Sequence, residues 1–176
     1  MKNGADTVYQ KILGDTIILE DSALIIERFG EVEYFVQEAE FFKKLRKTIV
    51  YREGDEIVLE ERFSTYFKIP FVKGNVWTDV FNNTVVFYED TFSLDYSLNG
   101  TVLNVLDLTV PAGTYSNVYK VLIKEREEIR RIDEVTLKER EEVYFFAPDV
   151  GPIKIEMLTY TENDTVFDVL ELLDFR

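Results

Sequence analysis

The chain contains neither cysteine nor histidine. It therefore cannot form disulfides, zinc fingers or iron–sulfur clusters, and it cannot use a thiol nucleophile or a Ser-His-Asp triad. The lack of cysteine leaves the redox compartment open, because an oxidising compartment permits disulfides without requiring them. Glutamine is also rare while lysine and glutamate are common, a composition typical of proteins from thermophiles.

Long hydrophobic runs are missing as well. No stretch approaches the roughly 18 apolar residues that a membrane span requires, and Met1–Asp6 lacks the apolar segment of a secretory leader. Two interpretations stay open: a cytosolic protein, or a mature chain whose leader has been removed.

Positive charge is scarce. There are 20 Lys and Arg against 34 Asp and Glu, which gives a formal net charge of −14. Nucleic acid and anionic membrane surfaces are themselves polyanions, so both are disfavoured as partners.

Apolar residues, by contrast, are plentiful. Hydrophobic residues make up 46% of the chain and aromatic residues 14%, with 14 Phe and 10 Tyr. A chain of this composition and of 176 residues can bury a core of its own. Because no linker, repeat or low-complexity segment interrupts it, we predict a single domain over residues 1–176.

Two corners organise the chain, and each combines proline with glycine. Pro111 fixes φ and removes a backbone donor, while Gly113 can adopt a positive φ at no steric cost. The pair predicts a sharp turn between two β-rich runs. Pro148, Gly151 and Pro152 predict a second corner of the same kind.

Residues 84–98 show the clearest alternation of apolar and polar residues. This pattern is typical of a strand in an antiparallel sheet with one buried face. The Asn99-Gly100 pair that follows predicts a hairpin turn leading into a strand that ends at Val110. The buried face is expected to carry Phe92, Leu94, Tyr96 and Leu98.

Other runs also predict strands. Gly54 indicates a hairpin between 48–52 and 57–60, and Gly74-Asn75 a turn before Trp77. The charged stretch 124–142 is interpreted as part of a hairpin whose strands face each other with opposite charges. The last strand is expected over 166–175.

Residues 31–46 are ambiguous. Phe35, Ala39, Phe42 and Leu45 fit a helical stripe, whereas the β-branched and aromatic run 32–36 favours a strand. Two successive strands are the preferred interpretation. The whole pattern predicts an all-β fold with room for one short helix, in the form of an antiparallel curled sheet or half-barrel.

Four segments together resemble a family of uncharacterised bacterial envelope proteins, many of them lipoproteins. That family carries a Val-Pro-Ala-Gly-Thr-Phe step and an Ala-Pro-Gly-Val-Gly-Leu-Val-Lys step in the same order. The likeness covers about the last 110 residues, and Tyr115, Asp149 and Pro152 depart from the family pattern. The matching segments are Ile69–Trp77, Val110–Tyr115, Tyr144–Lys154 and Leu170–Arg176.

The resemblance implies an extracytoplasmic location, in the periplasm or cell envelope, and a β fold similar to the half-barrels of lipoprotein carriers. It supplies no catalytic residues. The lipid-bearing cysteine of the family is not present in this sequence.

No catalytic or metal-binding motif stands out, and we expect no cofactor. Oxygen ligands at Glu162, Asn163, Asp164 and Asp168 suit calcium, but their spacing matches no calcium loop. The weak candidates for ligand binding are four aromatic residues: Trp77, which is expected foremost in the core, Tyr115, Tyr144 and Phe146.

Two hypotheses about function follow. The first is a non-enzymatic envelope domain that binds an apolar small molecule or lipid, or an envelope protein, on the concave face of its sheet. It requires an apolar cavity rather than a solid interior. The second is a hydrolase of an envelope substrate that uses paired carboxylates, and it requires buried carboxylates that are not paired with Lys or Arg.

Overall fold

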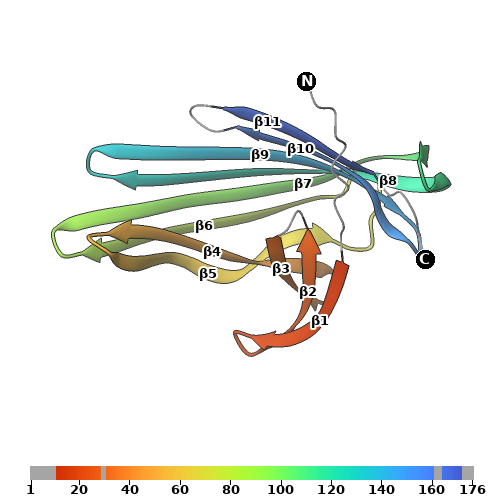
Figure 1. Ribbon diagram of the computed structural model, residues 1–176. Helices are drawn as coiled ribbons and strands as arrows, with labels where there is room; N and C mark the ends of the chain where they lie inside the picture. The colour runs from red at the N-terminus through yellow and green to blue at the C-terminus, as the bar shows by residue number, and fades with distance from the viewer. Residues whose placement is uncertain (1–10, 29–30, 161–163, 172–176) are drawn as a thin grey trace, which may run out of the picture.

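The computed structural model describes residues 11–28, 31–160 and 164–171 (Figure 1). Over these ranges the chain forms eleven β-strands and no helix, so the all-β prediction is confirmed. Every strand pairs antiparallel with the next one within its sheet. The first sheet contains β1 (Lys11–Ile18), β2 (Asp21–Arg28), β3 (Glu31–Glu38), β4 (Phe41–Arg52) and β5 (Asp55–Lys68).

The second sheet has six strands in the order β11-β10-β9-β8-β7-β6. Neither sheet closes into a barrel, and the two lie against each other with β5 next to β6 and β7. Their facing sides form the core. The strands are β6 (Val76–Phe87), β7 (Asp90–Val110), β8 (Gly113–Arg131), β9 (Glu134–Ala147), β10 (Gly151–Tyr160) and β11 (Thr165–Glu171).

Residues 31–46 form β3 and the start of β4, which settles the helix-or-strand ambiguity in favour of two strands. A β-hairpin brings Phe35 opposite Lys44. The hairpin at Gly54 is also present, and this glycine has a φ of 96°.

Both proline–glycine corners are present. Val110 pairs with Gly113 across the turn that joins β7 to β8. The second corner joins β9 to β10, and Pro152 lies in β10 beside a β-bulge, where a missing N–H is tolerated.

The predicted turn at Asn99-Gly100 is wrong, because β7 continues straight through it to Val110. A glycine is required at position 100 for a different reason. A Cβ built on Gly100 would lie 1.9 Å from Cε2 of Trp77, whose ring lies directly over the backbone there. The real turn, at residues 88–89, separates β6 from β7 inside the stretch 84–98. The predicted inward face is nevertheless correct, since Phe92, Leu94, Tyr96 and Leu98 are all buried.

The charged stretch 124–142 forms two long strands that pair across a turn at residues 132–133. Glu125 lies opposite Arg140, and Glu127 opposite Lys138, as the charge pattern predicts. β7 and β8 run for 21 and 19 residues, well beyond the roughly five or six residues of an ordinary strand. The last strand is observed over Thr165–Glu171, and the rest of its predicted range lies outside the described residues.

Two β-bulges in β5 decide what faces the core. The register with β4 skips Leu59 and Tyr66, so neighbouring residues are buried in pairs at both places. Side chains from β6 satisfy the backbone of the bulged residues. Trp77 Nε1 donates to the Tyr66 carbonyl at 3.0 Å, and Asn83 Nδ2 donates to the Leu59 carbonyl at 2.7 Å.

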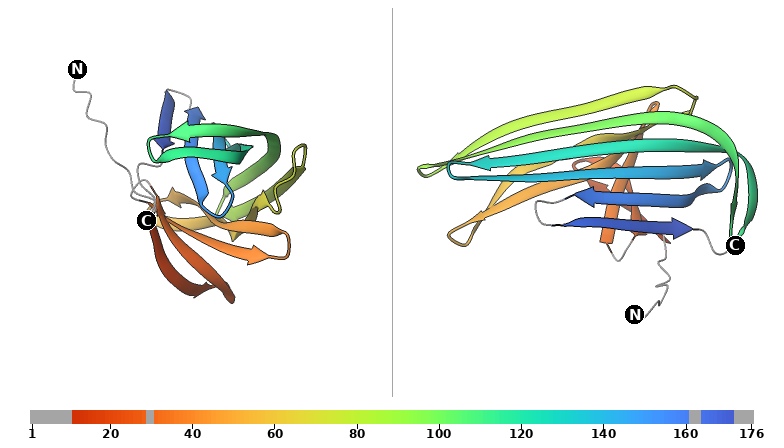
Figure 2. Two further views of the ribbon diagram at one scale, coloured as in Figure 1. Left: turned by 90° about the vertical axis from the view of Figure 1, so that its right-hand side faces the viewer. Right: turned by 90° about the horizontal axis from the view of Figure 1, so that it is seen from above.

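The far end of the β7–β8 hairpin bends away from the rest of its sheet (Figure 2). Register shifts near Leu103 and Asp107 mark the bend. The bent end packs on the side of β9 that faces away from the first sheet. This outer cluster contains Val110, Val118, Phe145, Ala147 and Ile153, with Tyr115 packed against it.

Candidate functional site

An apolar cavity of about 410 Å³ lies between the two sheets, at the end where the chain crosses from β5 to β6. Most of its lining is aliphatic or aromatic. One wall comes from β1 to β5 and the segment that follows β5: Ile12, Ile26, Glu33, Phe35, Gln37, Phe42, Phe67, Ile69 and Phe71. The other wall comes from β9 and the β9–β10 corner: Tyr144, Phe146, Val150, Gly151 and Pro152.

Stacked and edge-to-face ring pairs build the cavity walls. Phe35 stacks on Phe42 at 5.1 Å between centroids, and Tyr144 stacks on Phe146 at 5.6 Å. Phe67 meets Phe146 edge to face at 5.2 Å and so joins the two walls. Rigid rings that already contact each other cannot easily collapse into the space between them, which keeps the cavity open.

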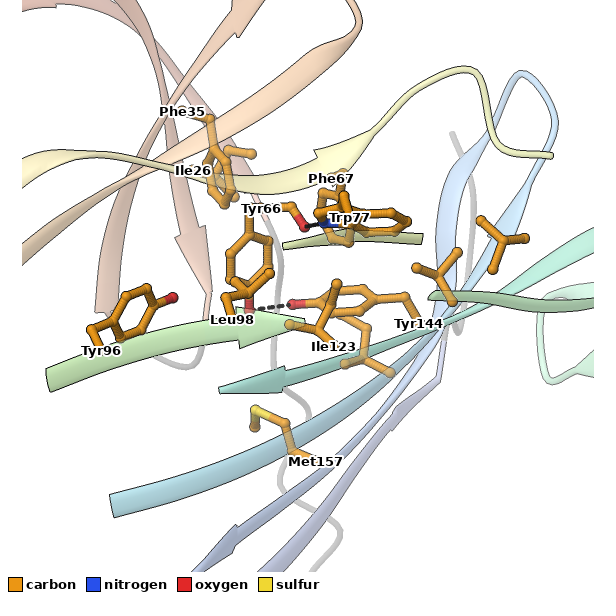
Figure 3. Close-up of a cluster of buried hydrophobic side chains, with 13 residues drawn as sticks. Ile26, Phe35, Tyr66, Phe67, Trp77, Tyr96, Leu98, Ile123, Tyr144 and Met157 are labelled. Atoms are coloured by element: carbon orange, nitrogen blue, oxygen red, sulfur yellow. Dashed lines mark hydrogen bonds between the residues drawn. The ribbon is translucent and has the colours of Figure 1, made fainter. Parts of the chain in front are cut away.

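A buried carboxylate, that of Glu142, accepts a hydrogen bond from a tyrosine of the cavity wall. Glu142, in β9, is fully buried and accepts hydrogen bonds from the hydroxyls of Tyr66 and Tyr144, the latter at 2.5 Å. Arg140 Nη1 lies 3.4 Å from its other oxygen. Figure 3 shows Tyr66 and Tyr144 reaching toward each other from opposite sheets, and their hydroxyl oxygens are 3.4 Å apart. The network therefore fixes the ring of Tyr144 that lines the cavity.

Farther along the strands the interior becomes charged. Arg46 of β4 crosses to the second sheet and lies 2.5 Å from Glu127 and 3.3 Å from Glu125. Its guanidinium carbon also lies 3.7 Å from the ring centroid of Tyr96. Burial alone would lower the pKa of Arg46, but Tyr96 and the nearby carboxylates raise it above its ordinary value.

Each buried carboxylate of the described chain is paired with arginine. Glu60 lies 3.1 Å from Arg46 and 2.8 Å from Arg62. Glu128 lies 2.6 Å from Arg126 and 2.5 Å from Arg130. With Glu142 beside Arg140, all three of these carboxylates have the environment of a structural ion pair.

The four aromatic candidates fall in three different places. Tyr144 and Phe146 lie together on the cavity wall. Trp77 is a core residue, 6% exposed, and does not line the cavity. Tyr115 packs in the outer cluster, on the opposite side of β9 from Tyr144.

Most of the cavity lining was missed from the sequence, because it comes from strands far apart in the chain. The run Tyr144-Phe145-Phe146 does carry a signal, since alternate residues of a strand face the same side. The wall from β3, with Phe35 and Gln37, carries no such signal, because the neighbours Phe35 and Val36 are both buried and a helical stripe overlaps the strand.

Within the described residues, no cluster of three or more acidic side chains is placed to hold a metal ion. Of the calcium candidates, Glu162 and Asn163 lie outside the described residues. The same part of the chain contains no helix that could cross a membrane. No family model, no curated protein and no solved structure matches this chain.

Proposed function

We propose that this protein is a non-enzymatic domain of the bacterial cell envelope that binds an apolar small molecule in the cavity between its two sheets. The single observation that carries the proposal is the cavity itself, with its volume of about 410 Å³ and its largely aromatic and aliphatic lining. Sites for small molecules in proteins generally have about 300–1,000 Å³ and a lining of this kind.

The arrangement of the walls supports binding rather than mere imperfect packing. An interior this rich in Phe and Tyr packs densely elsewhere, as where Trp77 lies on Gly100. The cavity is open to solvent on one side, so a small molecule can enter it. An open apolar hollow lined by rings that pack on each other is the arrangement expected of a site that a ligand fills.

The envelope location and the lipoprotein-like character in this proposal rest on the resemblance of the sequence. Binding of an envelope protein on the concave face remains a prediction, and so does the carboxylate-based hydrolase. The arginine partners of Glu60, Glu128 and Glu142 favour the binding domain over the hydrolase.

A fluorescent probe tests the proposal. N-phenyl-1-naphthylamine, a neutral apolar dye, is expected to bind the purified protein with increased emission at one site per chain. Val150→Trp places a large ring at the cavity wall and should weaken binding by about tenfold, equal to roughly 1.4 kcal/mol.

The matched control is Val86→Trp, at a position 68% exposed on β6, which should leave dye binding unchanged. Equal binding by both variants, or no saturable binding by the unmodified protein, would contradict the proposal.

A further inference from the structure

The described residues that line the cavity include few polar side chains, and none of these is positively charged. The described residues that line it include one carboxylate, Glu33, and one amide, Gln37, both from β3. They include no Lys or Arg. Glu33, Phe35 and Gln37 are alternate residues of β3. Their side chains therefore lie on the same side of the strand and form one strip of the cavity wall.

Donors for an anion are scarce in this lining, where the amide of Gln37 supplies the N–H groups among the described side chains. The hydroxyl of Tyr144 already donates to Glu142 at 2.5 Å. The N–H of Ile69 donates to the Glu40 carbonyl at 2.7 Å and that of Val150 to the Ala147 carbonyl at 3.3 Å, while Pro152 has no N–H. Gln37 is exposed, so a polar end beside it keeps contact with water. An anionic end there would lie near the carboxylate of Glu33, with no Lys or Arg among the described lining residues to attract it.

Acceptors are better represented. Lys44 Nζ lies 2.6 Å from one oxygen of Glu33, yet a carboxylate can accept several hydrogen bonds at once. Lys44 is not among the residues that line the cavity, and its ammonium also lies 5.1 Å from the ring centroid of Tyr66. The chain as a whole carries a formal charge of −14, which further opposes anions and favours cations.

We infer that the cavity selects apolar ligands whose polar end is a neutral hydrogen-bond donor or a cation, placed against Glu33 and Gln37, and that it discriminates against ligands with an anionic end. This inference rests on the proposed function and names the chemical class of its ligand. Alcohols and amines with a hydrocarbon body belong to the favoured class. Fatty acids and lipids with an anionic head group belong to the other.

The test uses three ligands with the same twelve-carbon chain, all below the concentrations at which they form micelles. Dodecan-1-ol, dodecyltrimethylammonium and dodecanoate each compete with N-phenyl-1-naphthylamine for the unmodified protein. The alcohol and the ammonium should displace the dye, and dodecanoate should bind at least about tenfold more weakly than the alcohol. Dodecanoate that competes as well as the alcohol overturns the inference and leaves the proposed function standing.

A charge-reversal variant sharpens the test. Glu33→Lys should improve dodecanoate binding by about tenfold and weaken binding of the ammonium, both measured relative to the affinity of the same variant for the dye. Glu56→Lys, at an exposed position of β5, is the matched control for the change in net charge. Equal improvement in both variants would mean that overall charge, not the cavity, decides, and that result overturns the inference. If the dye binds but none of the three ligands displaces it, the inference about the chemical class of the ligand is wrong. If the dye does not bind at all, the proposed function fails first.

Discussion

The interior between the two sheets has a hollow end and a filled middle, and the two differ in what holds the sheets together. At the hollow end, Phe67 and Phe146 contact each other across the sheets beside the cavity. In the filled middle, Arg46 reaches from β4 to Glu125 and Glu127 on β8. The same pair of sheets is thus joined by rings at one place and by ion pairs at another.

The difference teaches where this fold can bind something and where it cannot. Paired charges must contact each other closely to offset the loss of hydration, and around Arg46 they leave a polar pocket of only about 70 Å³. Ring faces are stable in contact with one another or with an apolar ligand, so a space between them can be filled and emptied. The following predictions test this contrast, from the largest expected effect to the smallest.

Removal of a charge from the filled middle should have the largest effect. Arg46→Met keeps most of the side-chain volume but leaves Glu60, Glu125 and Glu127 without their shared cation. Loss of one partner from a buried ionic network costs about 3–5 kcal/mol of the free energy of unfolding, which urea denaturation measures. The control is Lys124→Met, half exposed and paired with the partly exposed Glu141, which should cost less than about 1 kcal/mol. Equal costs would mean that the network is not buried as described.

Overpacking of the core where Trp77 lies on Gly100 should have the next largest effect. Gly100→Ala adds a methyl group that would lie 1.9 Å from the Trp77 ring, so the ring or the strand must move. We expect a loss of about 1–3 kcal/mol and a changed Trp fluorescence spectrum. Asn99→Ala, on the exposed neighbour, should stay within about 0.5 kcal/mol. A harmless Gly100→Ala would contradict the close approach of ring and backbone.

The hollow end should accept added volume. Ile26→Phe points a larger side chain into the cavity, and we expect stability to change by less than about 1 kcal/mol, since space is available there. The same substitution type at Val102, which is fully buried and does not line the cavity, should cost about 1–3 kcal/mol. Thermal unfolding of both variants compares the two sites. Equal losses would show that the hollow end is as tightly packed as the rest.

The smallest effect is expected in how the free energy of unfolding depends on pH under acidic conditions. Burial alone would raise the pKa of Asp79, but the hydrogen bonds from Arg62, at 2.6 Å, and from the Thr65 N–H, at 2.7 Å, lower it below its ordinary value. Asp79 therefore stabilises the fold above its unfolded pKa of about 3.9, and this stabilisation is lost as the pH falls through the folded pKa. Asp79→Asn should make the unfolding free energy less dependent on pH between about 5 and 3. Asp168→Asn, at an exposed position of β11, is the control for the change in net charge.

Local signals predicted the strands better than the turns between them. The alternation from Phe92 to Leu98 correctly identified a buried face, because a strand must place alternate residues on one side. Asn99-Gly100 led to a wrong prediction of a hairpin turn, since the same two residues suit both a tight turn and a strand that passes under a tryptophan. Nothing in the local sequence distinguishes these causes, because Trp77 is more than twenty residues away.

The cavity illustrates the same limit. Tyr144 and Phe146 could be proposed because they alternate on one strand, whereas their partners Phe35 and Phe67 come from the other sheet. The bulges at Leu59 and Tyr66 have no signature that the sequence analysis detected, and they decide which residues of β5 face inward. Glu60 would be expected at the surface from its type, yet it is 2% exposed.

By itself, the sequence determined the β class, the two proline–glycine corners and the exclusion of thiol and imidazole chemistry. These depend on the residue types and on the short-range geometry of the backbone. Only the tertiary structure decided that two sheets face each other, that charges lie in their middle and that rings line an open cavity at one end. Those features arise from contacts between residues far apart in the chain, whose register and bulges no local pattern specifies.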